Sequence, residues 1–90
     1  MRPLVALLLL ATPALAQVDA RVAFLTKQLE KGKDPRARSQ AALVLGATEE
    51  PEAVHPLCTG LEDPSEVVRA AAAKGLATLK ESSEIGRAHV

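Results

Sequence analysis

Residues 34–46 read DPRARSQAALVLG, and residues 63–77 read DPSEVVRAAAAKGLA. Each stretch opens with an Asp-Pro pair and continues into an arginine, a run of small residues and a leucine. The arginine, two alanines and the leucine of the first stretch recur 31 residues later, although the second stretch has two more residues between its proline and its arginine. Such a period predicts stacked helix pairs, because one pair cannot bury its own apolar face.

The chain contains four helical patterns separated by short turns. The first helix is predicted over residues 18–31, with Gly32 as its C-terminal stop. The second begins at Asp34, whose carboxylate can accept hydrogen bonds from the free amides of the first turn. Pro35 then occupies the first helical position without losing a hydrogen bond, and Gly46 closes the helix.

The third pattern is weakened by a proline and a glycine. Because its apolar residues follow at helical spacing, Cys58 is predicted to lie in the core as a small buried hydrophobe. The alternative for this thiol is intermolecular pairing. Pro56 would remove a hydrogen bond inside a helix, so we expect it in or near the first turn, after a loose entry at residues 52–55. The predicted buried stripe is Val54, Leu57, Cys58 and Leu61.

The fourth pattern starts with Asp63 as the cap, Pro64 at the first helical position and Glu66 as a capping-box partner. The helix is expected to end near Lys80, because residues 81–84 are polar. Its apolar stripe consists of Val68, Ala71, Ala72, Gly75, Leu76 and Leu79.

These motifs resemble HEAT-like repeats, particularly the short bacterial variety of phycobilisome-lyase-type proteins. The family pattern is an Asp-Pro turn, a helix reading Arg-x-x-Ala-Ala-x-x-Leu-Gly and a second helix with spaced leucines. Residues 34–80 match it, with Ala77 in place of the usual glycine. The resemblance implies an all-α fold, an α-solenoid of antiparallel helix pairs in a right-handed stack. It also implies a structural role, tying one repeat to the next, for the motif residues Asp34, Pro35, Arg38, Asp63, Pro64 and Arg69.

The expected organisation follows from this resemblance. Residues 17–33 form a preceding half-repeat or cap, residues 34–62 one HEAT-like repeat, and residues 63–80 the first helix of the next repeat. Residues 81–90 form a polar tail. The last six residues, 85–90, break from the repeat style. The codons ATC GGA AGA GCA CAC GTC, which would encode this hexapeptide, resemble a sequencing-library adapter. We interpret them as a read-through artefact in a longer protein; the alternative is a genuine divergent tail.

The N-terminus has the three-part layout of a secretory signal peptide. Arg2 supplies a positive charge, residues 4–11 are apolar, and Ala14 and Ala16 are the small residues of a cleavage site. The alternative, a transmembrane anchor, needs about 20 apolar residues. We therefore expect residues 1–16 to be removed by a cut after Ala16. The remaining chain is expected to be secreted or periplasmic, without membrane insertion.

Charge and composition argue against several classes of site. After the cut, ten Lys and Arg face eleven Asp and Glu, because Arg2 is the only charged residue removed. Such a balance argues against nucleic acid recognised through bulk charge. His55, Cys58 and His89 are too few and too scattered for a metal site. Cys58 with His55 is the only nucleophile and base pairing, and nothing nearby forms an oxyanion hole. We expect no catalytic residue, metal or cofactor.

The sequence favours a scaffold that binds a protein or peptide along an extended helical surface. The candidate contacts are His55, Thr59 and Glu62 on the second helix of the repeat. The alternative is a substrate-binding platform that precedes the catalytic part of a larger exported enzyme. A third interpretation is an accessory subunit of an envelope complex.

Overall fold

The computed structural model describes residues 13–88, and it describes side chains over residues 20–83. In this part of the chain there are helices and turns but no strand, as the sequence predicts. The elements are α2 (Pro13–Lys31), α3 (Pro35–Ala47), the short 3-10 helix η1 (Pro51–Ala53), α4 (Val54–Gly60) and α5 (Glu66–Ala88).

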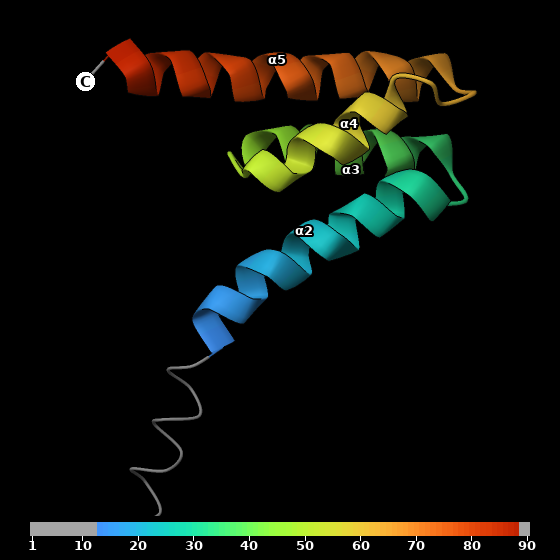
Figure 1. Ribbon diagram of the computed structural model, residues 1–90. Helices are drawn as coiled ribbons and strands as arrows, with labels where there is room; N and C mark the ends of the chain where they lie inside the picture. The colour runs from blue at the N-terminus through green and yellow to red at the C-terminus, as the bar shows by residue number, and fades with distance from the viewer. Residues whose placement is uncertain (1–12, 89–90) are drawn as a thin grey trace, which may run out of the picture.

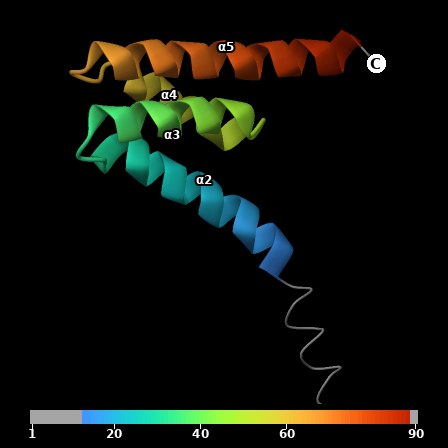
Figure 2. The same ribbon diagram turned by 180° about the vertical axis from the view of Figure 1, so that it is seen from behind.

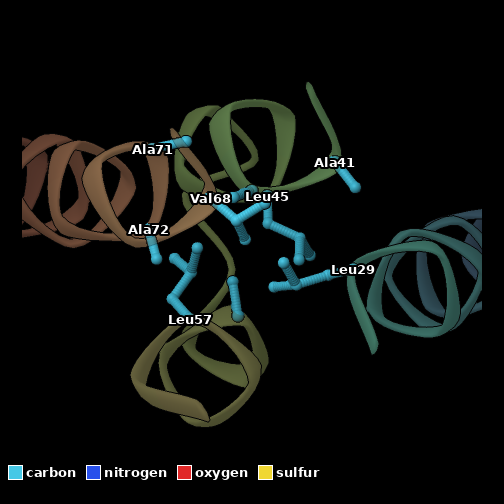
Figure 3. Close-up of a cluster of buried hydrophobic side chains, with 9 residues drawn as sticks. Leu29, Ala41, Leu45, Leu57, Val68, Ala71 and Ala72 are labelled. Carbon is cyan, nitrogen blue, oxygen red and sulfur yellow. The ribbon is translucent and has the colours of Figure 1, made fainter. Parts of the chain in front are cut away.

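The helices form two layers (Figures 1 and 2). α3 and α5 lie side by side and run in one direction, whereas α2 and α4 run in the opposite direction. α3 and α4 therefore form an antiparallel pair, with α5 beside α3 at one end of the stack and α2 at the other (Figure 3). This arrangement agrees with the predicted antiparallel helix pairs.

α2 contains the helix predicted over residues 18–31 and ends immediately before Gly32. It begins at Pro13, so the expected cut after Ala16 falls within its first turns. The rest of the predicted signal segment, residues 1–12, lies outside the described residues. Of the helices that the structure describes, none combines the length and the apolar character needed to cross a membrane.

α3 begins and ends within one residue of its predicted limits. Asp34 is the N-cap, and its Oδ1 accepts a hydrogen bond from the amide of Arg36 at 3.1 Å. The helix extends one residue past Gly46, and the Thr48 hydroxyl then donates to the carbonyl of Leu45 at 2.7 Å. Local capping chemistry therefore sets both ends of this helix.

α5 begins later than predicted. Asp63 does accept the amide of Ser65 at 2.8 Å, but the first helical residue is Glu66, so the prediction that Pro64 takes the first helical position is wrong. The Nη1 atom of Arg69 donates hydrogen bonds to the carbonyl oxygens of Asp63 and Pro64 at 2.8 and 3.1 Å. The two extra residues of the second stretch thus lie before the helix and do not lengthen it.

α5 also ends later than predicted. It continues past Lys80 to Ala88, through the polar residues 81–84. Polarity alone does not end a helix; a C-terminal stop needs a residue such as glycine in the left-handed conformation or a following proline. Residues 81–84 contain neither, so the expectation of an end near Lys80 was wrong.

The core contains one large, fully buried side chain from each of the four α-helices (Figure 3). Small residues surround them and let the helices approach closely. A Cβ atom placed on Gly75 would lie 2.8 Å from the carbonyl oxygen of Ala42, so α5 packs directly on the α3 backbone. The four large side chains are Leu29, Leu45, Leu57 and Val68.

The buried face of α4 differs from the predicted one. Pro56 lies in the first turn, as predicted, but it is buried. Cys58 is exposed, and 44% of Val54 and 40% of Leu61 are exposed, so the predicted burial of these three residues was wrong. The predicted burial of Leu57 is confirmed. The buried residues of η1 and α4 are Ala53, Pro56, Leu57 and Gly60.

Close packing explains this rotation of α4. A Cβ atom on Gly60 would lie 3.0 Å from the Cβ of Ala72 and 3.5 Å from the methyl groups of Leu29. The glycine therefore faces α5 and α2, where a larger residue would hold the helices apart. Pro56 has no amide hydrogen to leave unsatisfied, so it can be buried in a first turn at little cost.

Candidate partner-binding surface

Two open hollows follow the seam between α2 and α4. They share Glu30 on α2 and Pro56 on α4, and we refer to them together as the α2–α4 groove. The buried Pro56 lies between two rows of polar side chains. From α2 these are Lys27, Glu30 and Lys31, and from α4 and the turn after it His55, Thr59 and Glu62.

The structure brings the three predicted contact residues into this groove. His55 lines one hollow, and Thr59 and Glu62 line the other. All three are exposed; His55 and Thr59 lie four residues apart on one face of α4, and Glu62 follows in the turn after the helix. The Thr59 hydroxyl donates to the carbonyl of His55 at 3.2 Å, leaving its lone pairs toward solvent. Their role in binding remains a prediction.

The sequence did not identify the α2 wall of the groove. Lys27 and Glu30 are exposed and three residues apart, so they face the same way. In the sequence they resemble ordinary charges of a solvated helix surface, because only the crossing of α2 over α4 places them opposite His55 and Thr59. The signal that the sequence offers for this wall is the spacing of Lys27 and Glu30, three residues apart and beside the predicted apolar stripe of the helix.

His55 and Cys58, the base and nucleophile considered from the sequence, lie three residues apart on α4. Both are exposed on α4. Over residues 20–83, whose side chains the structure describes, no three His, Cys, Asp or Glu side chains are grouped so that they could hold a metal ion. His89, the other histidine considered from the sequence, lies outside the described residues.

Arg38 forms the central ion pair of the molecule with Asp63. Its Nε donates to Asp63 Oδ2 at 3.0 Å and its Nη2 donates to Oδ1 at 3.1 Å, while Nη1 donates to the carbonyl of Gly32 at 2.8 Å. The side chains are only 15% and 11% exposed. This two-pronged geometry connects the start of α3 to the start of α5 and is stronger than a surface pair.

The surroundings of Asp63 stabilise its ionised form. The hydrogen bonds from Arg38 are the main reason that the pKa of the Asp63 carboxyl lies below its ordinary value. The amide of Ser65 and the charges of Arg38 and Arg69 act in the same direction, and partial burial opposes them. The carboxylate is therefore held charged at the junction of the two helices.

Arg69 occupies the position on α5 that Arg38 occupies on α3. The amide of Arg38 donates to the Asp34 carbonyl and that of Arg69 to the Ser65 carbonyl, both at 3.0 Å, so each arginine lies in the first turn of its helix. Each also uses Nη1 to reach the carbonyl six residues before it. The motif therefore recurs in the structure as well as in the sequence.

The family model for HEAT repeats matches residues 22–85, from within α2 to within α5. The chain belongs to the HEAT-repeat family. HEAT repeats commonly mediate protein–protein interaction, and the family is generally non-catalytic. No curated protein matched the chain significantly. The family assignment agrees with the resemblance carried by the two Asp-Pro stretches, at the level of HEAT repeats as a whole.

Proposed function

We propose that this HEAT-repeat chain is an exported scaffold that binds a protein or peptide partner along the α2–α4 groove. The observation that carries the proposal is the convergence of exposed polar side chains from two helices on the apolar Pro56 between them. Such a surface can hold a chain segment through many modest contacts.

The composition of the groove indicates the chemistry of the partner. Lys27, Glu30 and Lys31 give its α2 side a net positive charge, and Glu52 and Glu62 give its α4 side a net negative charge. A segment with charges of both signs around a small apolar residue would pair with both walls and place the apolar residue on Pro56. A partner of uniform charge would be repelled by one wall, which favours specificity over tight binding.

The proposal of export is supported by the N-terminal sequence. The charged start, the apolar run and the small residues at positions 14 and 16 have the layout of a cleaved signal. N-terminal sequencing of the chain recovered from the growth medium or periplasm would test it. A new N-terminus at Gln17 is expected, and recovery of the intact Met1 form from the cytoplasm would contradict export.

The alternative function is a substrate-binding platform in a larger exported enzyme. It is supported by the hypothesis that residues 85–90 are an artefact, which would place further sequence after Glu84. Sequencing the genomic DNA beyond the codon for Glu84 distinguishes the two. Further Asp-Pro-x-x-Arg repeats would favour the scaffold, and catalytic motifs would favour the enzyme.

Site-specific photo-crosslinking tests the binding proposal in the source cell. A photoreactive residue replaces Thr59 in one variant and Leu43, an exposed residue on α3, in the matched control. We expect one partner to be captured repeatedly from position 59 and not from position 43. Equal capture at the two positions would contradict a partner site in the α2–α4 groove.

A further inference from the structure

Phe24 is the only aromatic residue of the chain, and it is 61% exposed on α2. It lines neither of the two hollows that form the α2–α4 groove. A single exposed apolar side chain is common on protein surfaces, so the residues around it decide whether it has a role. Around Phe24 these residues are mainly cations.

Three cations share one face of α2 with Phe24. Arg21 and Lys27 lie three residues before and after it, and Lys31 lies seven residues after it, which are spacings that keep side chains on one side of a helix. All three cations are exposed. The only acidic residue within residues 20–31 is Glu30, and it lines the α2–α4 groove. We refer to Arg21, Phe24, Lys27 and Lys31 as the basic face of α2.

The zero net charge of the chain conceals a separation of charge along it. Residues 20–33 contain four Lys and Arg and one Glu. Residues 47–66 contain six Asp and Glu and neither Lys nor Arg. Because the field near a surface depends on the nearest charges, α2 can be attracted to an anionic surface although the whole chain is neutral.

The basic face of α2 differs from the surfaces on which the helices of this chain pack. Those surfaces contain small residues in close contact, such as Gly46 against Gly75. Cations packed against another helix in that way would lose their hydration, which is costly without a partner charge. α2 diverges from α3 and α4 toward its N-terminal end, so its far side is not covered by the other described helices (Figures 1 and 2).

We infer that the basic face of α2 binds the surface of an anionic lipid bilayer. Phe24 enters the boundary between headgroups and acyl chains, and the cations beside it lie among the lipid phosphates while keeping part of their hydration. α2 lies along the surface, and no helix crosses the bilayer. An acidic protein would attract the same cations but would also need an apolar pocket for Phe24, whereas a bilayer accepts this side chain anywhere on its surface. The inference goes beyond the proposed scaffold function, and Arg21 and Phe24 lie outside the α2–α4 groove.

Flotation with lipid vesicles tests the inference. The chain is expressed from Met1, and the form that the cell retains is purified and checked by mass spectrometry. Wild type should bind vesicles of phosphatidylcholine mixed with phosphatidylglycerol at least about tenfold more tightly than vesicles of phosphatidylcholine alone. Added salt should weaken the binding, because it screens the charges. Phe24→Ser and Arg21→Glu should each weaken binding to the anionic vesicles at least about fivefold.

Matched variants on α5 serve as controls. Val67→Ser removes an apolar side chain that is also 61% exposed, and Lys74→Glu reverses the charge of an exposed cation. Both should bind the anionic vesicles as wild type does, and circular dichroism checks that every variant is folded. Equal binding of wild type to the two kinds of vesicle would overturn the inference, as would folded Phe24→Ser and Arg21→Glu variants that bind like wild type. Binding of wild type to polyglutamate but not to anionic vesicles would also overturn it, and would assign the basic face to an acidic protein.

Discussion

A Cβ atom placed on Gly46 would lie 2.4 Å from the Cα atom of Gly75, so the backbones of α3 and α5 are in direct contact. No side chain can be accommodated between them without moving a helix. The hydrophobic core is completed beneath this contact by Leu57, whose methyl groups lie close to Gly75.

Gly46→Ala should therefore destabilise the chain although alanine favours helices. Overpacking typically costs about 1–3 kcal/mol, and the clash is with backbone, which cannot relax by changing rotamer. We expect a net loss near the upper end of that range in the free energy of unfolding, measured by urea denaturation. Gly60→Ala is the comparison, because its nearest contact would be 3.0 Å to the Cβ of Ala72, so the helices need to move apart by less and the loss should be smaller. Equal effects of the two substitutions would argue against direct contact of α3 and α5.

Removal of the carboxylate of Asp63 should cost more stability than removal of the N-cap of α3. Asp63→Ala breaks both hydrogen bonds to Arg38 and leaves a largely buried guanidinium, for a loss of about 2–3 kcal/mol. Asp34→Ala removes one capping bond, for a loss of about 1 kcal/mol. Denaturation of both variants checks the order, and a smaller loss for Asp63→Ala would contradict a structural role for the ion pair.

The same pair predicts an acid-dependent loss of stability. The folded-state pKa of Asp63 is depressed, so its contribution is fully present above the pKa of the unfolded chain, about 3.9. It is lost as the pH falls below that value and through the folded-state pKa. The free energy of unfolding of wild type should thus fall more steeply in this range than that of Asp63→Asn, measured between pH 6 and about pH 2.5. Parallel curves would show that the carboxylate is not held charged by Arg38.

Exposure of Cys58 predicts a reactive thiol in the folded chain. An aromatic disulfide reagent should modify Cys58 without denaturant, at a rate close to that in the unfolded chain. Limited access slows the reaction of buried thiols, and the exposed Cys58 thiol is free of that limit. The control places the thiol at a buried site by combining Cys58→Ser with Leu57→Cys. If native Cys58 reacted as slowly as the control, α4 would be rotated toward the stripe that sequence periodicity suggested.

Local interactions decide where a helix begins, whereas tertiary packing decides which face of it is buried. The start of α3 was predictable because Asp34 and Pro35 act on their own backbone neighbours. Its end was predicted to within one residue, but Thr48 caps it, and Gly46 lies inside the helix against Gly75. The buried face of α4 was not predictable, since hydrophobicity favoured Cys58 over Gly60, and only the proximity of Ala72 makes glycine the residue to bury. An apolar stripe predicts which residues can be buried, whereas helix crossing decides which of them are.

The candidate site divides in the same way. His55 and Thr59 could be placed on one face from their spacing alone, and Glu62 lies in the turn after that helix. Lys27 and Glu30 could not be assigned to the same groove, because they are separated from α4 in the chain by all of α3. A structural role for Arg38 and Asp63 was implied only by the resemblance to HEAT-like repeats, and the ion pair between them was not predicted.

The most direct test of the scaffold account is the affinity of the crosslinked partner for the purified chain, measured by isothermal titration calorimetry. The triple variant His55→Ala, Thr59→Ala and Glu62→Ala removes the α4 wall, and Gln40→Ala on α3 serves as the control. The dissociation constant of the triple variant should be at least about tenfold larger than that of wild type, and that of the control should be unchanged. An unchanged affinity for a folded triple variant would contradict binding in the α2–α4 groove.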